Sequence, residues 1–246
     1  MGNEKYSIVM GDKDHVEITI REVNSVNELP VEPPVFLALQ GTITAPLEFL
    51  SKRILDINQI PQQRSHITVD RENMAIVLVT NENDPYLIGH IKGDLEYHPK
   101  FEEFGINSSK VWTPSELGMF FKMNRAFFST KEDNMKLVTD LMNFKASVDN
   151  KIERSLKETG DRTDNFAQVV NSNLPKAFNL VIPIFKGMPA ETIEVETFAR
   201  INGREVSFIL LSPGAQQIVE EVRDKVIDEQ LSKIREIAPD IVIIEQ

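Results

Sequence analysis

Strand-type and helix-type patterns occupy separate stretches of this 246-residue chain, and this segregation constrains its fold more than any other feature. Strand patterns fill most of residues 1–110, helical patterns fill residues 111–160, and a hairpin, a helix and a terminal strand follow in residues 161–246. Doubly wound folds instead alternate strands with helices. The sequence therefore predicts an α+β fold, in one compact domain, with antiparallel sheet regions at both ends of the chain, a long central helical segment and a C-terminal helix.

Four strands and a short helix are predicted in the N-terminal region. Val16–Arg21 alternates apolar and polar residues, and Val35–Leu39 and Met74–Val79 are continuously apolar. Alternation is typical of half-buried strands, and a short apolar run is typical of buried ones. Leu87–His98 also alternates and predicts a further strand, and Pro46–Asp56 carries the apolar stripe of a short helix.

Two helix start signals open the central region. Thr113-Pro114-Ser115-Glu116 combines a capping box with a proline in the first turn, and Thr130 begins a second start. After Thr130, apolar residues recur at steps of three and four, which predicts a helix of about 27 residues, roughly 40 Å long. The members of this stripe are Leu137, Leu141, Phe144, Val148, Ile152 and Leu156.

The C-terminal region begins after a polar stretch, 158–174, that is predicted to be a loop. Pro183 inside the apolar run Phe178–Phe185 indicates an edge strand or a bulge. Asn202-Gly203 between two strand patterns predicts a hairpin. A helix is predicted after Pro213, and Ile241–Ile244 predicts a terminal strand.

The composition excludes several classes of function. The chain has no cysteine, which excludes disulfide scaffolds, cysteine-based zinc sites and cysteine catalysis. With 27 basic and 38 acidic residues the net charge is −11, which argues against general capture of duplex DNA. No apolar run approaches the ~20 residues of a membrane span. Glycine-rich phosphate loops and the Gly-x-Ser-x-Gly motif are missing, so no cofactor and no catalytic residue are expected. A chain without cysteine is indifferent to redox compartment, so a cytoplasmic location is the default expectation.

Polar residues on one side of the predicted strand Leu87–His98 are candidate metal ligands. Asp94, Glu96 and His98 alternate there, and two carboxylates with an imidazole could hold a divalent ion if another segment contributed. The alternative is the solvated face of an antiparallel sheet. A metal-dependent hydrolase is accordingly one possible function.

Aromatic and basic residues alternate at the end of the first central helix. Phe120, Phe121, Arg125 and Phe128 combine the rings and the charge that single-strand binders use to stack bases and contact phosphates. The same phenylalanines fit the buried face of a helix. A single-stranded nucleic-acid-binding protein of phage replication or recombination is thus a second possibility.

Self-association has the strongest basis in the sequence. An isolated helix of the predicted length would leave its apolar stripe uncovered, and Ile241–Ile244 lacks polar alternation. A partner copy would cover both segments. The interface residues predicted on this basis are Leu141, Val148, Ile152, Ile241 and Ile243.

Several segments resemble the YfdQ-like family of uncharacterised phage and prophage proteins. They are Gly41–Thr44 before Phe49, Asp94–His98, and above all Phe178–Gly187, which is similar to the family's Phe-x-Leu-x-Ile-Pro-x-Phe-x-Gly stretch. The resemblance implies a viral setting in a bacterial host cytoplasm and brings no catalytic residues. The sequence favours a non-enzymatic phage-type accessory protein that acts as a homo-oligomeric assembly or interaction module, whose partner is itself or another phage protein.

Overall fold

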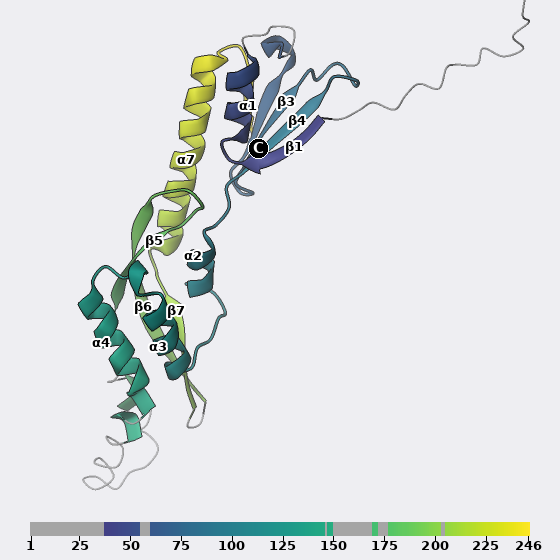
Figure 1. Ribbon diagram of the computed structural model, residues 1–246. Coiled ribbons are helices and arrows are strands. Elements are labelled where there is room, and N and C mark those ends of the chain that lie inside the picture. Colours follow the sequence, from purple (N-terminus) through teal and green to yellow (C-terminus); the bar gives the residue numbers. More distant parts are fainter. Residues whose placement is uncertain (1–36, 55–59, 146, 150–168, 172–176, 203–204) are drawn as a thin grey trace, which may run out of the picture. The chain divides into compact units, whose positions relative to one another are not determined.

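The computed structural model describes residues 37–54, 60–145, 147–149, 169–171, 177–202 and 205–246. Val35–Gln246 form one compact unit (Figure 1). The fold is α+β, as the sequence predicts. The predicted strand Val16–Arg21 lies outside the described residues, as does most of the predicted loop, of which 169–171 are described and helical.

A five-stranded sheet combines segments from both ends of this unit. Its strand order is β1-β4-β3-β2-β8. The sheet is mixed rather than antiparallel throughout, because β1 pairs parallel with β4 and β8 pairs parallel with β2. The C-terminal strand therefore completes a sheet whose other members come from the first hundred residues. The strand bounds are β1 Leu37–Thr42, β2 His66–Asp70, β3 Ala75–Thr80, β4 Gly89–Asp94 and β8 Val242–Glu245.

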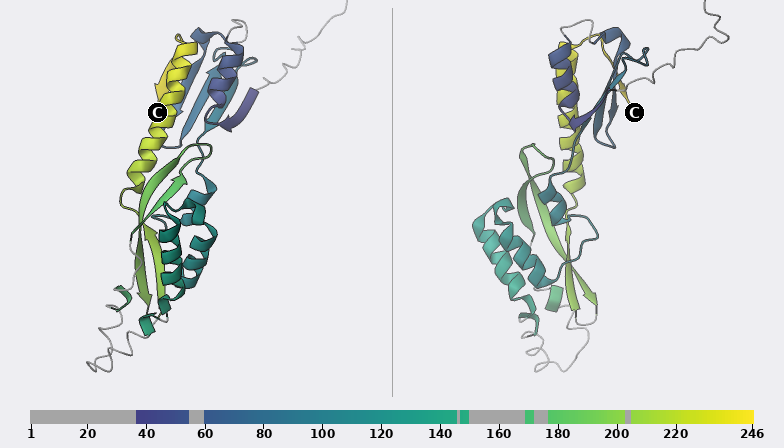
Figure 2. Two further views of the ribbon diagram at one scale, coloured as in Figure 1. Left: turned by 60° about the vertical axis from the view of Figure 1, so that its left-hand side comes forward. Right: turned by 45° about the vertical axis from the view of Figure 1, so that its right-hand side comes forward.

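Two helices, α1 (Ala45–Arg53) and α7 (Ala215–Ile237), lie on the same face of this sheet (Figures 1 and 2). Their apolar stripes bury Leu50, Leu231 and similar residues against the inward side chains of the strands. Side chains alternate between the two faces of a strand, so every second residue of these strands lies on the opposite face of the sheet, which neither α1 nor α7 covers. This open face is important for the function proposed below.

A three-stranded antiparallel sheet forms from β5 (Phe178–Pro183), β6 (Ala190–Asn202) and β7 (Glu205–Leu211). The hairpin predicted around Asn202 is confirmed by the pairing of β6 with β7. Pro183 is the last residue of β5, an edge strand of this sheet, which is a position where proline is tolerated.

Three further α-helices, two short 3₁₀ turns and short helical segments at residues 144–145, 147–149 and 169–171 complete the helical structure of the described residues. The predicted caps are present: Thr113 and Glu116 form the reciprocal capping box of α3, and the Thr130 hydroxyl accepts from the Asp133 N–H at the start of α4. The bounds are α2 Pro99–Phe104, α3 Pro114–Met123, α4 Lys131–Met142, and the 3₁₀ turns Gln62–Arg64 and Arg125–Phe127.

Two predicted elements differ in extent from what the sequence indicates. The helix predicted from Thr130 is interrupted at Asn143 (φ −97°, ψ 3°), where Phe144 packs edge-on against Phe208 at 5.1 Å between ring centroids, and residues 144–145 and 147–149 are again helical. The strand predicted over Leu87–His98 is confined to β4. The part of the predicted helix from residue 150 onward lies outside the described residues.

Candidate functional site

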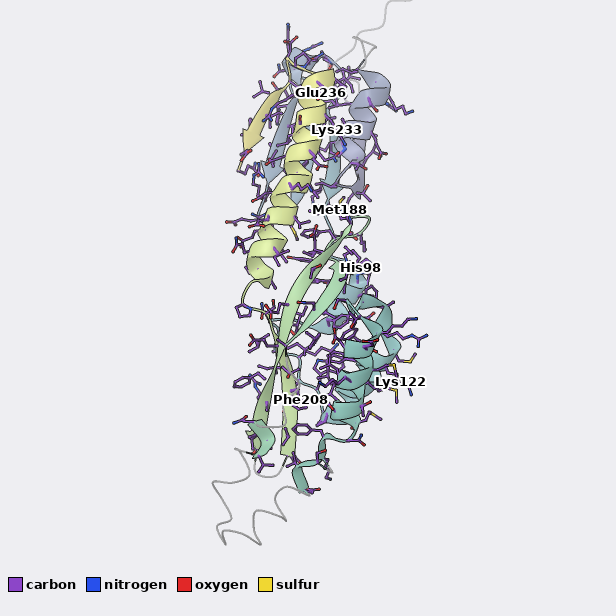
Figure 3. All side chains as sticks on the ribbon, turned by 90° about the vertical axis from the view of Figure 1, so that its left-hand side faces the viewer. His98, Lys122, Met188, Phe208, Lys233 and Glu236 are labelled. Atoms are coloured by element: carbon purple, nitrogen blue, oxygen red, sulfur yellow. The ribbon has the colours of Figure 1, made fainter. Side chains whose placement is uncertain are left out.

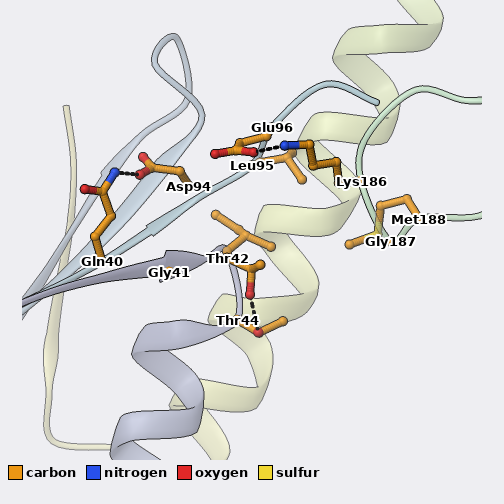
Figure 4. A pocket seen from close by; sticks show the side chains of 11 residues that line it. Gln40, Gly41, Thr42, Thr44, Asp94, Leu95, Glu96, Lys186, Gly187 and Met188 are labelled. Atoms are coloured by element: carbon orange, nitrogen blue, oxygen red, sulfur yellow. Dashed lines mark hydrogen bonds and ion pairs between the residues drawn. The ribbon is translucent and has the colours of Figure 1, made fainter. Parts of the chain in front are cut away.

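A pocket of about 580 Å³ opens where the parallel strands β1 and β4 end (Figure 4). The carboxyl ends of parallel strands are a common place for ligands to bind. The turn after β5 forms the wall of the pocket opposite these strand ends. A hydrogen bond from the backbone N–H of Lys186 to the Glu96 carbonyl, at 2.9 Å, holds the turn in this position. The pocket is lined by Gln40, Gly41, Thr42, Ile43, Thr44, Asp94, Leu95, Glu96, Lys186, Gly187 and Met188.

Two glycines give this pocket its backbone geometry. A Cβ on Gly93 would lie 2.7 Å from the Pro46 Cδ and 2.8 Å from the Thr42 carbonyl oxygen, so only glycine allows α1 to begin this close to β4. Gly187 adopts φ +74°, in the left-handed region that favours glycine.

The polar groups around the pocket bond to one another. The Gln40 Nε2 donates to the Asp94 carboxylate at 2.7 Å, and the Lys92 Nζ lies 2.8 Å from the same carboxylate. The hydroxyls of Thr42 and Thr44 are 3.0 Å apart, and Lys186 forms an ion pair with Glu96. The lining includes no histidine, serine or cysteine.

The three predicted metal ligands do not converge. The Asp94 carboxylate contacts Gln40 and Lys92, whereas Glu96 pairs with Lys186. The Nδ1 of His98 accepts from the Lys100 N–H at the start of α2. No group of three potential ligands suitable for a metal ion occurs among the residues that the structure describes.

The predicted stacking residues lie in an aromatic cluster. Phe121 and Phe128 are buried, with ring centroids 5.0 Å apart, and Phe120 is half-buried 4.7 Å from Trp112. In this fold neither Phe121 nor Phe128 offers a ring face to a nucleic-acid base. Of the four predicted residues, only Arg125 is exposed.

The predicted interface residues belong mostly to the interior of one chain. Leu141, Val148 and Ile241 are buried, and Ile243 is half-buried. Ile152 lies outside the described residues. The inference that a partner must cover these positions is therefore wrong for Leu141, Val148 and Ile241, because the helices and sheets of the same chain already cover them.

The sequence did not predict that two apolar residues of β8 are exposed. Val242 is 60% exposed and Ile244 is 46% exposed. Their register partners on β2 are His66 and Thr68, so both side chains lie on the open face of the five-stranded sheet. This exposure could have been predicted from the sequence. An edge strand needs burial on one face only, and side chains alternate between the two faces, so two residues of Ile241–Ile244 can be buried while the other two are exposed.

Comparison with known proteins gave no match to a family, to a curated protein or to a solved structure. Among the described residues, no helix combines the length and apolar character required to cross a bilayer.

Proposed function

We propose that this protein is a non-enzymatic assembly module that self-associates through β8. The observation that supports this proposal is an apolar, exposed strand at the edge of the five-stranded sheet. Val242 and Ile244 are the side chains that a second copy would cover.

An open sheet edge favours pairing because each outward N–H and C=O group lacks a strand partner. Proteins that remain monomeric commonly protect such edges with proline, bulges or free charges. The β8 sequence Val-Ile-Ile-Glu has no proline, and its single charge, Glu245, is paired with Arg71 at 3.0 Å. The β8 edge therefore has few of the usual features that prevent association.

In a dimer with twofold symmetry, the β8 edge of each copy would pair with the β8 edge of the other. Most homo-oligomers are closed by such symmetry, in which the same patch serves both partners. If β8 pairs antiparallel with β8 of a second copy, the two five-stranded sheets become one continuous sheet, and Val242 and Ile244 lie beside their equivalents on its open face.

The opposite edge, β1, is a weaker candidate. Leu37 and Leu39 are exposed there. The residues that precede β1 lie outside the described part of the chain, however, so the structure does not define what lies beside that strand.

Lysine at both exposed positions of β8 should abolish self-association. In the variant Val242→Lys/Ile244→Lys, like charges would face one another across the interface. We expect light scattering at micromolar concentration to give a multiple of 28.0 kDa for the wild-type protein and the monomer mass for the variant. The matched control is Leu87→Lys, which changes an exposed leucine outside every strand and should leave the mass unchanged. A monomeric wild-type protein would contradict the proposal.

The resemblance of Phe178–Gly187 to the YfdQ-like family adds a setting to this proposal. We propose on that basis that the assembly acts in a phage-infected or prophage-carrying bacterium, with itself or another phage protein as partner. The backbone hydrogen bond from the Lys186 N–H to the Glu96 carbonyl connects this segment to the residues that follow β4. This part of the proposal depends on the resemblance alone.

A further inference from the structure

Four methionines are exposed on the helices α3 and α4. Met123 and Met135 are 76% and 68% exposed, and Met119 and Met142 are each 49% exposed. They are half of the eight methionines of the chain. Figure 3 shows sulfur atoms on the outer side of the helical region, near the labelled Lys122. We call these four residues the methionine patch.

The helices α3 and α4, which carry these four side chains, pack against each other. The Asn134 Nδ2 near the start of α4 donates to the Phe121 carbonyl late in α3, at 3.1 Å. At the other end, a Cβ on Gly118 would lie 3.1 Å from the Met142 sulfur. The helices are therefore antiparallel, and glycine at position 118 lets the Met142 side chain lie across α3.

The core does not require these methionines. The inward faces of the two helices are already filled by Leu117, Phe121, Leu137 and Leu141, all buried. Methionine is flexible and polarisable, and it is over-used on surfaces that accommodate apolar side chains of partners. A clustered exposed apolar patch commonly marks an interaction site.

Basic residues slightly outnumber acidic ones in the segment that carries the methionine patch, in an otherwise acidic protein. The segment Pro114–Lys145 has five basic and four acidic residues, whereas the whole chain carries −11. Two of the acids, Glu116 and Asp133, are engaged in the helix caps. No ion pair joins the cations of this surface to another residue that the structure describes. These cations are Lys122, Arg125, Lys131 and Lys136.

We propose that the methionine patch is a docking surface for an acidic amphipathic helix of a partner protein. The apolar face of that helix would lie on the methionines, and its carboxylates would meet the cations of the same segment. This is the helix-in-groove mode of recognition. The surface shares no residue with β8, so the proposal is independent of self-association.

The test uses two synthetic helical peptides of about 18 residues, long enough to form helix on binding. Both carry leucine on one face, and the other face carries glutamate in one peptide and lysine in the second. Because the protein is strongly acidic, general charge attraction would favour the lysine peptide. We expect fluorescence anisotropy to show that the glutamate peptide binds at least about tenfold more tightly, with affinity that falls as salt rises.

The variant Met123→Glu/Met135→Glu places charge in the middle of the patch and should weaken binding of the glutamate peptide by at least about tenfold. Both side chains are exposed, so circular dichroism and the melting temperature should match the wild type. The control Leu87→Glu adds the same charge at an exposed leucine outside the patch and should leave binding unchanged.

Three results would overturn this proposal. The first is equal or tighter binding of the lysine peptide. The second is unchanged affinity in the double variant. The third is a lower mass of the double variant in solution, which would show that a second copy occupies the patch.

Discussion

Replacing Phe121 by alanine is expected to lower the free energy of unfolding by about 3–5 kcal/mol, the usual cost of removing a buried aromatic ring. The Phe121 ring is fully buried and packs edge-on against Phe128 and Phe178 at 5.0 and 5.1 Å. It thereby connects α3 to β5. Urea unfolding followed by the fluorescence of the single tryptophan, Trp112, measures the loss.

The control for this prediction is Met123→Ala on the same helix, which should change the free energy of unfolding by less than about 0.5 kcal/mol because the side chain is exposed. If Phe121→Ala does not fold, Phe121→Leu should fold with a smaller loss in the same direction. A loss under about 1 kcal/mol for Phe121→Ala would contradict the buried position and would make a binding role for this ring credible again.

Replacing Arg71 by methionine should also destabilise the protein, by about 1 kcal/mol at neutral pH. The Arg71 guanidinium contacts three carboxylates from two elements: Asp224 and Asp228 on α7, and Glu245 on β8. Methionine keeps the apolar stem but leaves these carboxylates facing one another. Because Glu245 belongs to β8, we also expect weaker self-association of this variant by light scattering.

The pH dependence separates this charge effect from a packing effect. The hydrogen bond from Arg71 lowers the pKa of Glu245, and the hydrogen bond from Arg223, with that from Arg71, lowers the pKa of Asp224. A carboxyl whose pKa is lower in the folded protein stabilises it above the unfolded pKa, and this contribution disappears as the pH falls through the folded pKa. The wild-type protein should therefore lose more stability than Arg71→Met between pH 6 and about pH 3. Parallel curves would contradict this explanation.

Local patterns were enough to predict most of the elements. Capping chemistry at Thr113 and Thr130, the turn residues around Asn202 and the apolar run Met74–Val79 each act within a few residues, so their structural outcome follows from neighbours in the chain. The α+β class follows from the order of these elements.

Features that depend on distant contacts could not be predicted in the same way. The pairing of β8 with β2 joins residues more than 170 positions apart, and it decides which side of Ile241–Ile244 is buried. The helix is interrupted at Asn143, beside a contact between Phe144 and Phe208, two residues that are distant in the chain. The pocket at the end of β1 requires the turn at Lys186, which no local pattern connects to Thr42.

The central claim, that β8 pairs with β8 of a second copy, is tested most directly by cross-linking. The chain has no cysteine, so Val242→Cys and Ile244→Cys each introduce a single thiol. Under mild oxidation, at least one of the two should form disulfide-linked dimers about tenfold faster than the control Leu87→Cys, because association brings equivalent strand positions together. Equal rates at all three positions would contradict the claim.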